Sequence, residues 1–266
     1  MLAEERRQAI IKILERDQKV VARSLAREFN ISVDSIRRDL TIMEEQGLLR
    51  KAYGGAVPII RRVPLPDQER YSEGSLLQNS ISRFAASYIQ KNDTVFIGGA
   101  GIHYGMLKYL PRHFPYTVVT NSLKVSQSIR EITNIESYII GGKLNRLSGN
   151  VNDSYALEQI RRLSLDVCFI TGGGITLKGF SNSSFEAANF AQAVCEVSNM
   201  AIGLAPHDKF GTDMFVRSVP IHGLDLIITD QETPQDIVES IRKLGVEVAI
   251  APVETQGDNN STEDCQ

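Results

Sequence analysis

Two adjacent arginines, Arg37 and Arg38, stand in the stretch ISVDSIRRDL, residues 31–40. Each guanidinium is planar and permanently charged, so it can form two hydrogen bonds with a phosphate or with the acceptor edge of guanine. Further polar candidates on this stretch or just after it are Ser32, Asp34, Ser35 and Thr41. The stretch therefore predicts contact with a nucleic acid, although two arginines alone could also form an ordinary solvated surface.

A second set of candidate residues follows short apolar runs in the remainder of the chain. Glycines at such positions let backbone N–H groups approach an anion, and the N-terminus of a following helix adds partial positive charge. Lys209 could supply a formal positive charge. The candidates for binding a small molecule are Gly98, Gly99, Ala100, Gly101, Ile102, Asn121, Gly141, Gly142 and Lys209.

Three helices are expected to position the arginines. Apolar periodicity predicts one helix around residues 6–14 and a second over residues 22–29. Ser32 suits the N-cap of a third helix, which would continue to about Gln46 and end at Gly47. Its expected buried face is Ile36, Leu40 and Met43, at intervals i, i+4 and i+7. The arginines should then lie on the exposed side.

A small wing is expected after the third helix. The stretch LLRKAYGGAV, residues 48–57, indicates a strand, a Gly-Gly turn and a returning strand. It adds Arg50, Lys51 and Tyr53 to the candidate DNA contacts. With a helix-turn-helix from about Val20 to Asp39, this predicts a winged helix-turn-helix whose third helix enters the major groove.

Seven short, β-branched apolar runs follow, most of them separated by helix-length amphipathic segments. They cover residues 94–99, 117–122, 138–142, 167–174, 200–206, 226–230 and 246–251. Strands buried on both faces have this pattern, so we expect an α/β fold with a mainly parallel sheet. The expected organisation is a winged helix-turn-helix domain at 1–57, a proline-rich linker at 58–74, an α/β effector-sensing and oligomerisation domain at 75–251, and a disordered tail at 252–266.

Charge is unevenly distributed between the two expected domains. The formal net charge is -3, yet residues 1–62 hold 13 Lys and Arg against 9 Asp and Glu, whereas the remaining residues hold 16 against 23. Only the N-terminal domain is suited by charge to a polyanion. No apolar run could span a bilayer, no signal peptide is evident, and three widely spaced cysteines show no metal-ligand pattern. We expect a cytoplasmic protein without metal, cofactor or membrane partner.

A longer set of motifs surrounds the arginines. It consists of Arg6-x3-Ile10-x3-Leu14, Ser32-x2-Ser35-Ile36-Arg37-Arg38-Asp39-Leu40 and Arg50-x3-Gly54-Gly55-Ala56. This combination resembles the DeoR family of bacterial transcriptional regulators. Ser35 stands where that family usually has Thr, and Tyr53 where it often has His, and neither difference argues against DNA binding. For Asp39 we expect a structural ion pair, with Arg6 as the candidate partner, rather than a contact with cytosine.

The resemblance continues to about Ala251 and implies a sensor domain similar to sugar-phosphate isomerases, responding to phosphorylated sugars. Its landmarks are Glu69-Arg70, Thr120-Asn121-Ser122, Gly141-Gly142, Gly174, Gly179, Lys209-Phe210-Gly211 and Thr229-Asp230. Where the family usually has Asp-Ser-Gly-Thr-Thr, this chain has Gly98-Gly99-Ala100-Gly101-Ile102, so a carboxylate and two hydroxyls are missing. Four further residues could read a different ligand or be ordinary surface or helix-cap residues: His103, Glu186, His207 and Asp208.

Two other functions remain to be weighed. The stretch GGAGIHYG resembles a dinucleotide-binding loop, but Tyr104 stands where the third glycine belongs. A sugar-phosphate isomerase-like enzyme with an attached DNA-binding unit is the alternative, supported by fold analogy alone. The sequence predicts instead a repressor of a carbohydrate-metabolism operon, released by a small metabolite such as a phosphorylated sugar. Because one helix-turn-helix buries little surface, we expect a homodimer or homotetramer.

Overall fold

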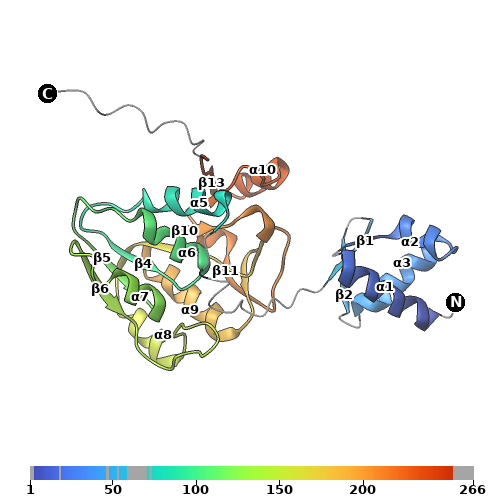
Figure 1. Ribbon diagram of the computed structural model, residues 1–266, viewed down its shortest axis with the longest axis horizontal. Helices are drawn as coiled ribbons and strands as arrows, with labels where there is room; N and C mark the ends of the chain where they lie inside the picture. The colour runs from blue at the N-terminus through green and yellow to red at the C-terminus, as the bar shows by residue number, and fades with distance from the viewer. Residues whose placement is uncertain are drawn as a thin grey trace. The chain divides into compact units, whose positions relative to one another are not determined.

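The computed structural model describes residues 3–17, 19–45, 48–52, 54–58, 71 and 74–253. The chain divides into two compact units, Met1–Arg61 and Arg62–Gln266 (Figure 1). Most of the predicted linker, and the predicted tail beyond its first two residues, lie outside the described residues.

The first unit is a winged helix-turn-helix. Its elements are α1 (Ala3–Asp17), β1 (Val20–Val21), α2 (Ala22–Glu28), α3 (Val33–Glu45), β2 (Leu49–Ala52) and β3 (Gly55–Pro58). β3 pairs antiparallel with both β1 and β2. Gly54, between β2 and β3, has a φ of 78°, a conformation that glycine adopts without strain. The predicted helices and wing are confirmed, whereas Gln46, Gly47 and Tyr53 lie outside the described residues.

The second unit is built on a seven-stranded parallel sheet. Its strands are β4 (Thr94–Ile97), β5 (Tyr116–Thr120), β6 (Ile135–Ile139), β7 (Leu165–Ile170), β10 (Ser198–Leu204), β12 (Leu226–Thr229) and β13 (Glu247–Ile250). They lie in the order β13-β12-β10-β7-β4-β5-β6. Each overlaps one of the predicted runs, although β6 shares only residues 138–139 with its run, and the α/β fold with a mainly parallel sheet is confirmed. Chain order reverses between β4 and β7, the position where open α/β sheets bind ligands.

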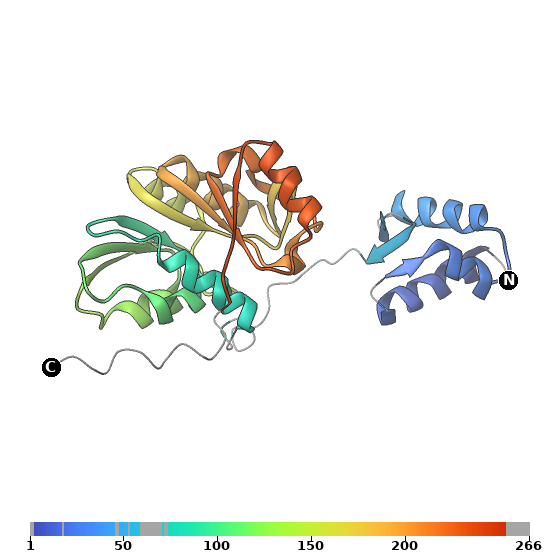
Figure 2. The same cartoon turned by 90° about the horizontal axis from the view of Figure 1, so that it is seen from above.

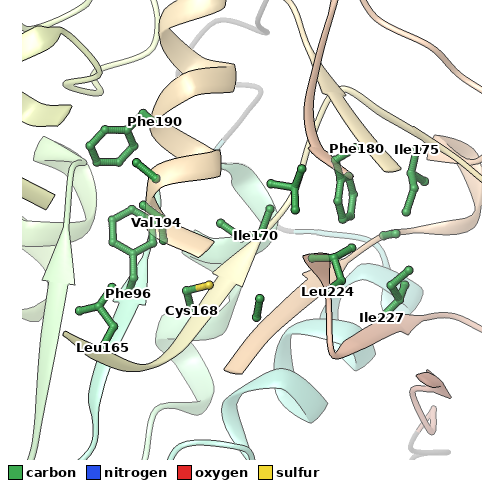
Figure 3. Close-up of a cluster of buried hydrophobic side chains, with 14 of the residues drawn as sticks. Phe96, Leu165, Cys168, Ile170, Ile175, Phe180, Phe190, Val194, Leu224 and Ile227 are labelled. Carbon is green, nitrogen blue, oxygen red and sulfur yellow. The ribbon is translucent and has the colours of Figure 1, made fainter. Parts of the chain in front are cut away.

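Helices cover both faces of this sheet (Figure 2). One face is covered by α5 (Leu76–Ala86), α6 (Gly101–Met106) and α7 (Leu123–Ile129), and the other by α8 (Ser154–Ile160), α9 (Phe185–Glu196) and α10 (Gln235–Lys243). Side chains of a strand alternate between the two faces of the sheet. Val95 therefore packs in the hydrophobic core under α5, α6 and α7, and Phe96 packs in the core under α8, α9 and α10. Figure 3 shows Phe96 and Cys168 of the sheet facing Phe190 and Val194 of α9. This double covering explains the continuous apolar runs.

A smaller antiparallel sheet was not predicted. It has the order β11-β9-β8 and consists of β8 (Gly174–Thr176), β9 (Gly179–Asn182) and β11 (Val216–Pro220). Its strands are short and mix glycine, hydroxyl and proline residues, so they carry no alternation signal. The run predicted over residues 167–174 is therefore two elements, since β7 ends at Ile170 and Gly174 opens β8. None of the described helices is long and apolar enough to cross a bilayer.

Candidate functional site

The helix α3, which carries the paired arginines, is fixed at its start and along one side. Oγ of Ser32 accepts a hydrogen bond from the backbone N–H of Ser35 at 3.1 Å, as predicted for an N-cap. The predicted buried face consists of Ile36, Leu40 and Met43, each at most 2% exposed. Arg37 and Arg38 consequently lie on the outer side, and both are exposed.

The outer side of α3 forms a shallow groove lined by Asp34, Arg37, Arg38, Thr41 and Ile42. Nη1 of Arg37 lies 3.1 Å from Oδ1 of Asp34, and these side chains are 66% and 76% exposed. An ion pair so exposed contributes little, so the guanidinium can exchange this carboxylate for another acceptor. The groove therefore offers two guanidinium groups to an anionic partner.

The wing adds an ammonium group beside this groove. Nζ of Lys51, on β2, donates to Oγ1 of Thr41 at 2.9 Å, and the Lys51 backbone N–H donates to Oε1 of Glu44 at 2.7 Å. These bonds tie β2 to α3. The side chain of Arg50 and all of Tyr53 lie outside the described residues. The other predicted DNA contacts lie on α3, at its cap or on β2: Ser32, Asp34, Ser35, Arg37, Arg38, Thr41 and Lys51.

Asp39 points to the opposite side of α3 from the groove. Its Oδ2 lies 2.6 Å from Nε of Arg6 on α1, and its Oδ1 lies 4.0 Å from Nη1 of Arg7. The Asp39 side chain is 5% exposed. The predicted ion pair with Arg6 is confirmed, and it holds α3 against α1.

In the second unit, part of the predicted ligand site gathers at the ends of two neighbouring strands. Gly98 and Gly99 follow β4, Asn121 and Ser122 follow β5, and a bridge pairs Ser122 with Asn150. A Cβ built on Gly99 would lie 1.8 Å from Oδ1 of Asn150 and 2.7 Å from Oγ of Ser122. The sequence did not point to Asn150, because its role depends on a contact between distant loops.

His103 lies against the same loop, with Nδ1 3.0 Å from a Cβ built on Gly98. It is 4% exposed, so it is not the surface residue that was one possibility. Burial lowers its pKa from 6.5 to about 4, although the carbonyls of Gly98 and Phe169 oppose the shift. The ring is therefore neutral at pH 7. Neither ring nitrogen makes a hydrogen bond of good geometry with any described residue.

Two amide oxygens near the ends of β4 and β5 also lack partners among the described residues. Nδ2 of Asn121 donates to O of Val151 at 3.1 Å and to Oδ1 of Asn152 at 2.6 Å, which fixes the orientation of the amide. Its Oδ1 and the Oδ1 of Asn150 are buried without a hydrogen bond. The polar cluster formed by His103, Asn121 and Asn150 thus has four unpaired buried atoms.

The loop over this polar cluster, residues 98–102, is held by side chains distant in the sequence. Oη of Tyr71 donates to O of Gly99 at 3.1 Å, and its ring meets the ring of Tyr104 edge-on with centroids 5.0 Å apart. Oγ of Ser82 donates to O of Ile102 at 2.9 Å. The sequence did not point to Tyr71, which lies in the predicted linker.

Gly141 and Gly142, after the edge strand β6, are already engaged. The backbone N–H of Gly141 donates to Oε1 of Gln159 at 3.1 Å, and its carbonyl accepts from Nε2 of the same side chain. The backbone N–H of Lys143 donates to Oδ2 of Asp153 at 3.0 Å. Protein side chains therefore occupy two of the backbone donors that an anion could use here.

The remaining candidates lie on other elements. Lys209 is in the 3₁₀ helix η2 (His207–Lys209) after β10, and β10 is two strands from β4, roughly 10 Å across the sheet. His207 lies between two carboxylates, with Nδ1 2.9 Å from Oδ1 of Asp230 and Nε2 3.3 Å from Oε2 of Glu232. Asp208 shares η2, and Glu186 lies in the first turn of α9. Lys209 therefore begins from a different strand end than Gly98 and Asn121.

No group of three or more His, Cys, Asp or Glu side chains suited to a metal occurs in the part of the chain that the structure describes. Cys168 and Cys195, far apart in the sequence, meet between β7 and α9 as free thiols. The hydrogen bond between them and burial raise the pKa of Cys195, so its reactive thiolate form is disfavoured.

Two family models match the chain. The DeoR-like helix-turn-helix domain matches residues 6–61, and the DeoR C terminal sensor domain matches residues 77–231. Together they cover most of both units.

Several curated proteins are similar over nearly their whole length. A putative aga operon transcriptional repressor of Escherichia coli O157:H7 is 26% identical, covering 92% of this chain and 93% of that protein. The HTH-type transcriptional repressor GlcR of Bacillus subtilis (strain 168) is 28% identical, covering 94% and 97%. The glycerol-3-phosphate regulon repressor of Escherichia coli (strain K12) is 25% identical, covering 88% and 94%.

Similarity to solved structures is weaker. Ribose 5 phosphate isomerase A from Neisseria gonorrhoeae is 13% identical, with a TM-score of 0.37 over 54% of this chain and 56% of that chain. The eIF2B beta subunit from Chaetomium thermophilum is 14% identical, with a TM-score of 0.40 over 57% and 47%. Scores this low show only that parts of the folds are alike, and the activities of those proteins say nothing about this chain.

Proposed function

The chain belongs to the DeoR family of transcriptional regulators, and on that premise we propose that it represses a carbohydrate-metabolism operon by binding its operator through α3 and the wing. The observation that carries this proposal is the exposed groove on α3, with Arg37 and Arg38 on a helix fixed by its cap and buried face. Arginine on such a helix can read guanine in the major groove, while Lys51 on the wing suits a phosphate. We propose a cytoplasmic location, because the operator DNA that it would bind lies there.

We propose that the second unit senses a metabolite at the carboxyl ends of β4 and β5. The relatives named for the aga operon and the glycerol-3-phosphate regulon support a ligand derived from carbohydrate metabolism. The unpaired atoms of the polar cluster support a binding site there. We propose regulation rather than catalysis, because the polar cluster contains two amides and one neutral imidazole, and none of these is an activated nucleophile.

We also propose that the protein assembles into a dimer or tetramer through its second unit. A helix-turn-helix dimer places two recognition helices one turn of DNA apart, and the second contact supplies affinity that a single module lacks. The motif here forms one compact unit with its own core, so the partner helix must come from another copy.

The double change Arg37→Ala with Arg38→Ala tests the proposed DNA contact. Operator fragments are first selected from genomic DNA by the full-length protein. We expect the double variant to bind them roughly 2–6 kcal/mol more weakly, at about 1–3 kcal/mol for each arginine contact. The matched control is Arg161→Ala with Arg162→Ala, a second adjacent and exposed arginine pair, located in the second unit. Equal operator affinity of the double variant and the control at the same salt concentration would contradict the proposal.

A further inference from the structure

The unpaired atoms of the polar cluster define the chemistry of the ligand more closely than the family does. Among the described residues, six buried side-chain atoms lack a hydrogen-bond partner, and four of them belong to the polar cluster. Nearly all buried polar atoms in proteins have a hydrogen-bond partner, because a buried atom without one has lost its hydrogen bond to water and gained none in return. A concentration of them at the switch point of a parallel sheet therefore points to a ligand that pairs them.

The three side chains border the turn after β4 or the segments bridged to it. Nδ1 of His103 is adjacent to Gly98, and Oδ1 of Asn150 is adjacent to Gly99, so the two side chains flank consecutive residues of one loop. Asn121 directly precedes Ser122, which bridges to Asn150, and its amide is fixed with Oδ1 left unpaired. A ligand that displaces the turn at residues 98–100 would approach Asn121 and Asn150, with His103 beside it on the following helix α6.

The unpaired atoms need hydrogen-bond donors more than acceptors. The two amide oxygens can only accept, whereas a neutral imidazole offers one donor and one acceptor. A hydroxyl group donates and accepts, so it can pair with any of these atoms. A phosphate ester at neutral pH presents oxygens that chiefly accept, and two amide oxygens would repel them.

The cluster also lacks the charge that a phosphate needs. The segments that form it, residues 98–103, 121–122 and 150–152, contain no lysine or arginine. The neighbouring Lys124 has its Nζ 5.7 Å from the centroid of the Tyr104 ring. At the edge strand, the backbone donors of Gly141 and Lys143 are taken by Gln159 and Asp153. An anion here would find no lysine or arginine within these segments to pair with, and an ammonium group would face uncharged oxygens.

We propose that the polar cluster binds an uncharged, hydroxyl-rich molecule, a sugar or polyol that carries no phosphate. This inference rests on the proposed function, because it identifies the class of effector for the same sensor unit. The ligand's hydroxyls donate to Oδ1 of Asn121 and Oδ1 of Asn150 and exchange a hydrogen bond with His103. The turn at residues 98–100, which precedes α6, is held by a side-chain hydrogen bond from Tyr71 to O of Gly99, of small net strength, so this turn can shift to admit the ligand.

The test uses the full-length protein and matched pairs of compounds in calorimetric titrations. The pairs are D-glucitol and D-glucitol 6-phosphate, N-acetyl-D-galactosamine and its 6-phosphate, and myo-inositol and myo-inositol 1-phosphate. We expect at least one uncharged compound to bind, about tenfold or more tightly than its phosphate ester. Tighter binding of the phosphate in every pair that binds, or no binding of any uncharged compound at millimolar concentration, overturns the inference.

A variant of Asn150 assigns the binding to the cluster. Asn150→Leu removes the acceptor at similar size and should weaken the uncharged ligand about tenfold or more. Ser218→Ala is the matched control, since Oγ of Ser218 is also buried and unpaired but lies outside the cluster. Wild-type affinity in Asn150→Leu would overturn the inference.

Operator binding, measured by gel shift on the same samples, separates this inference from the function on which it rests. Failure of the wild-type protein to bind operator DNA would refute the proposed function. Intact operator binding together with a preference for phosphate esters would refute only the ligand class.

Discussion

Asp39 illustrates how one carboxylate can position a binding surface without touching the ligand. The Asp39 side chain is 5% exposed and pairs with Arg6 at 2.6 Å. We expect Asp39→Asn to lower the free energy of unfolding of residues 1–61 by about 3 kcal/mol, because it leaves a largely buried guanidinium uncompensated. Urea denaturation of that fragment measures the change. Asp34→Asn is the control, since its exposed pair with Arg37 should contribute less than about 1 kcal/mol.

The buried imidazole of His103 predicts a specific pH dependence of stability. The pKa of His103 is about 4 in the folded chain, whereas its ordinary value of 6.5 applies to the unfolded chain. Between these two pH values the unfolded chain therefore binds a proton that the folded chain does not bind. The free energy of unfolding should fall as the pH drops from 6.5 towards 4, by up to about 1.4 kcal/mol per pH unit from this residue.

Comparison of His103→Gln with wild type isolates this contribution. Between pH 6.5 and pH 5, above the usual range of carboxyl groups, the variant should lose less stability in denaturant titrations than wild type does. The exposed His222 provides the control variant, His222→Gln, which should follow wild type. Parallel curves for wild type and His103→Gln would show that the ring is not kept neutral by burial.

At the scale of elements, the size of the side chain that the turn after β4 can accept at position 99 is limited by the surrounding space and not by the backbone conformation. A Cβ on Gly99 would lie 1.8 Å from Oδ1 of Asn150, so a larger side chain must displace the amide that we assign to the ligand. We expect Gly99→Val to abolish the response to the effector while operator affinity stays within about twofold. Release of operator DNA by the best-binding compound of the titrations is the measurement. Gly223→Ala, whose Cβ would make contacts no closer than 3.5 Å, should respond normally.

The strands were predictable where burial left a continuous pattern. Runs such as residues 95–97 and 226–228 are apolar throughout because helices cover both faces, and the sequence alone locates them. The strands β8, β9 and β11 could not be found this way, since three to five residues with glycine and hydroxyl side chains show no period.

The residues of the candidate sites were predictable only in part, because some of them are brought together by contacts between distant segments of the chain. Glycines at strand ends and an N-capping serine are local signals, and they located Gly98 and Ser32 correctly on their elements. The contacts of Asn150 with Gly99, and of Tyr71 with the same residue, join loops separated by tens of residues. No local propensity encodes such contacts, so the sequence assigned neither residue.

At the scale of the whole molecule, the two units should divide the work between them. We expect a fragment of residues 1–61 to keep salt-dependent DNA affinity, with log affinity falling by about 0.9 per phosphate contact for each unit of log salt. A fragment of residues 62–266 should bind no DNA, because acidic residues outnumber basic ones there, and it should carry the assembly. Gel shifts and light scattering measure the two properties, and DNA binding by the second fragment would contradict the division.

The position of β4 in the middle of its sheet affects how the protein is made. β4 lies between β5 and β7, and β7 begins only at Leu165, so a nascent chain exposes one edge of β4 until then. The first unit is complete at Arg61, whereas the sheet is finished only with β13. At about 5–20 residues per second, translation separates these events by roughly 10–40 s. Each new chain therefore carries a complete helix-turn-helix before it has the sheet that would control it.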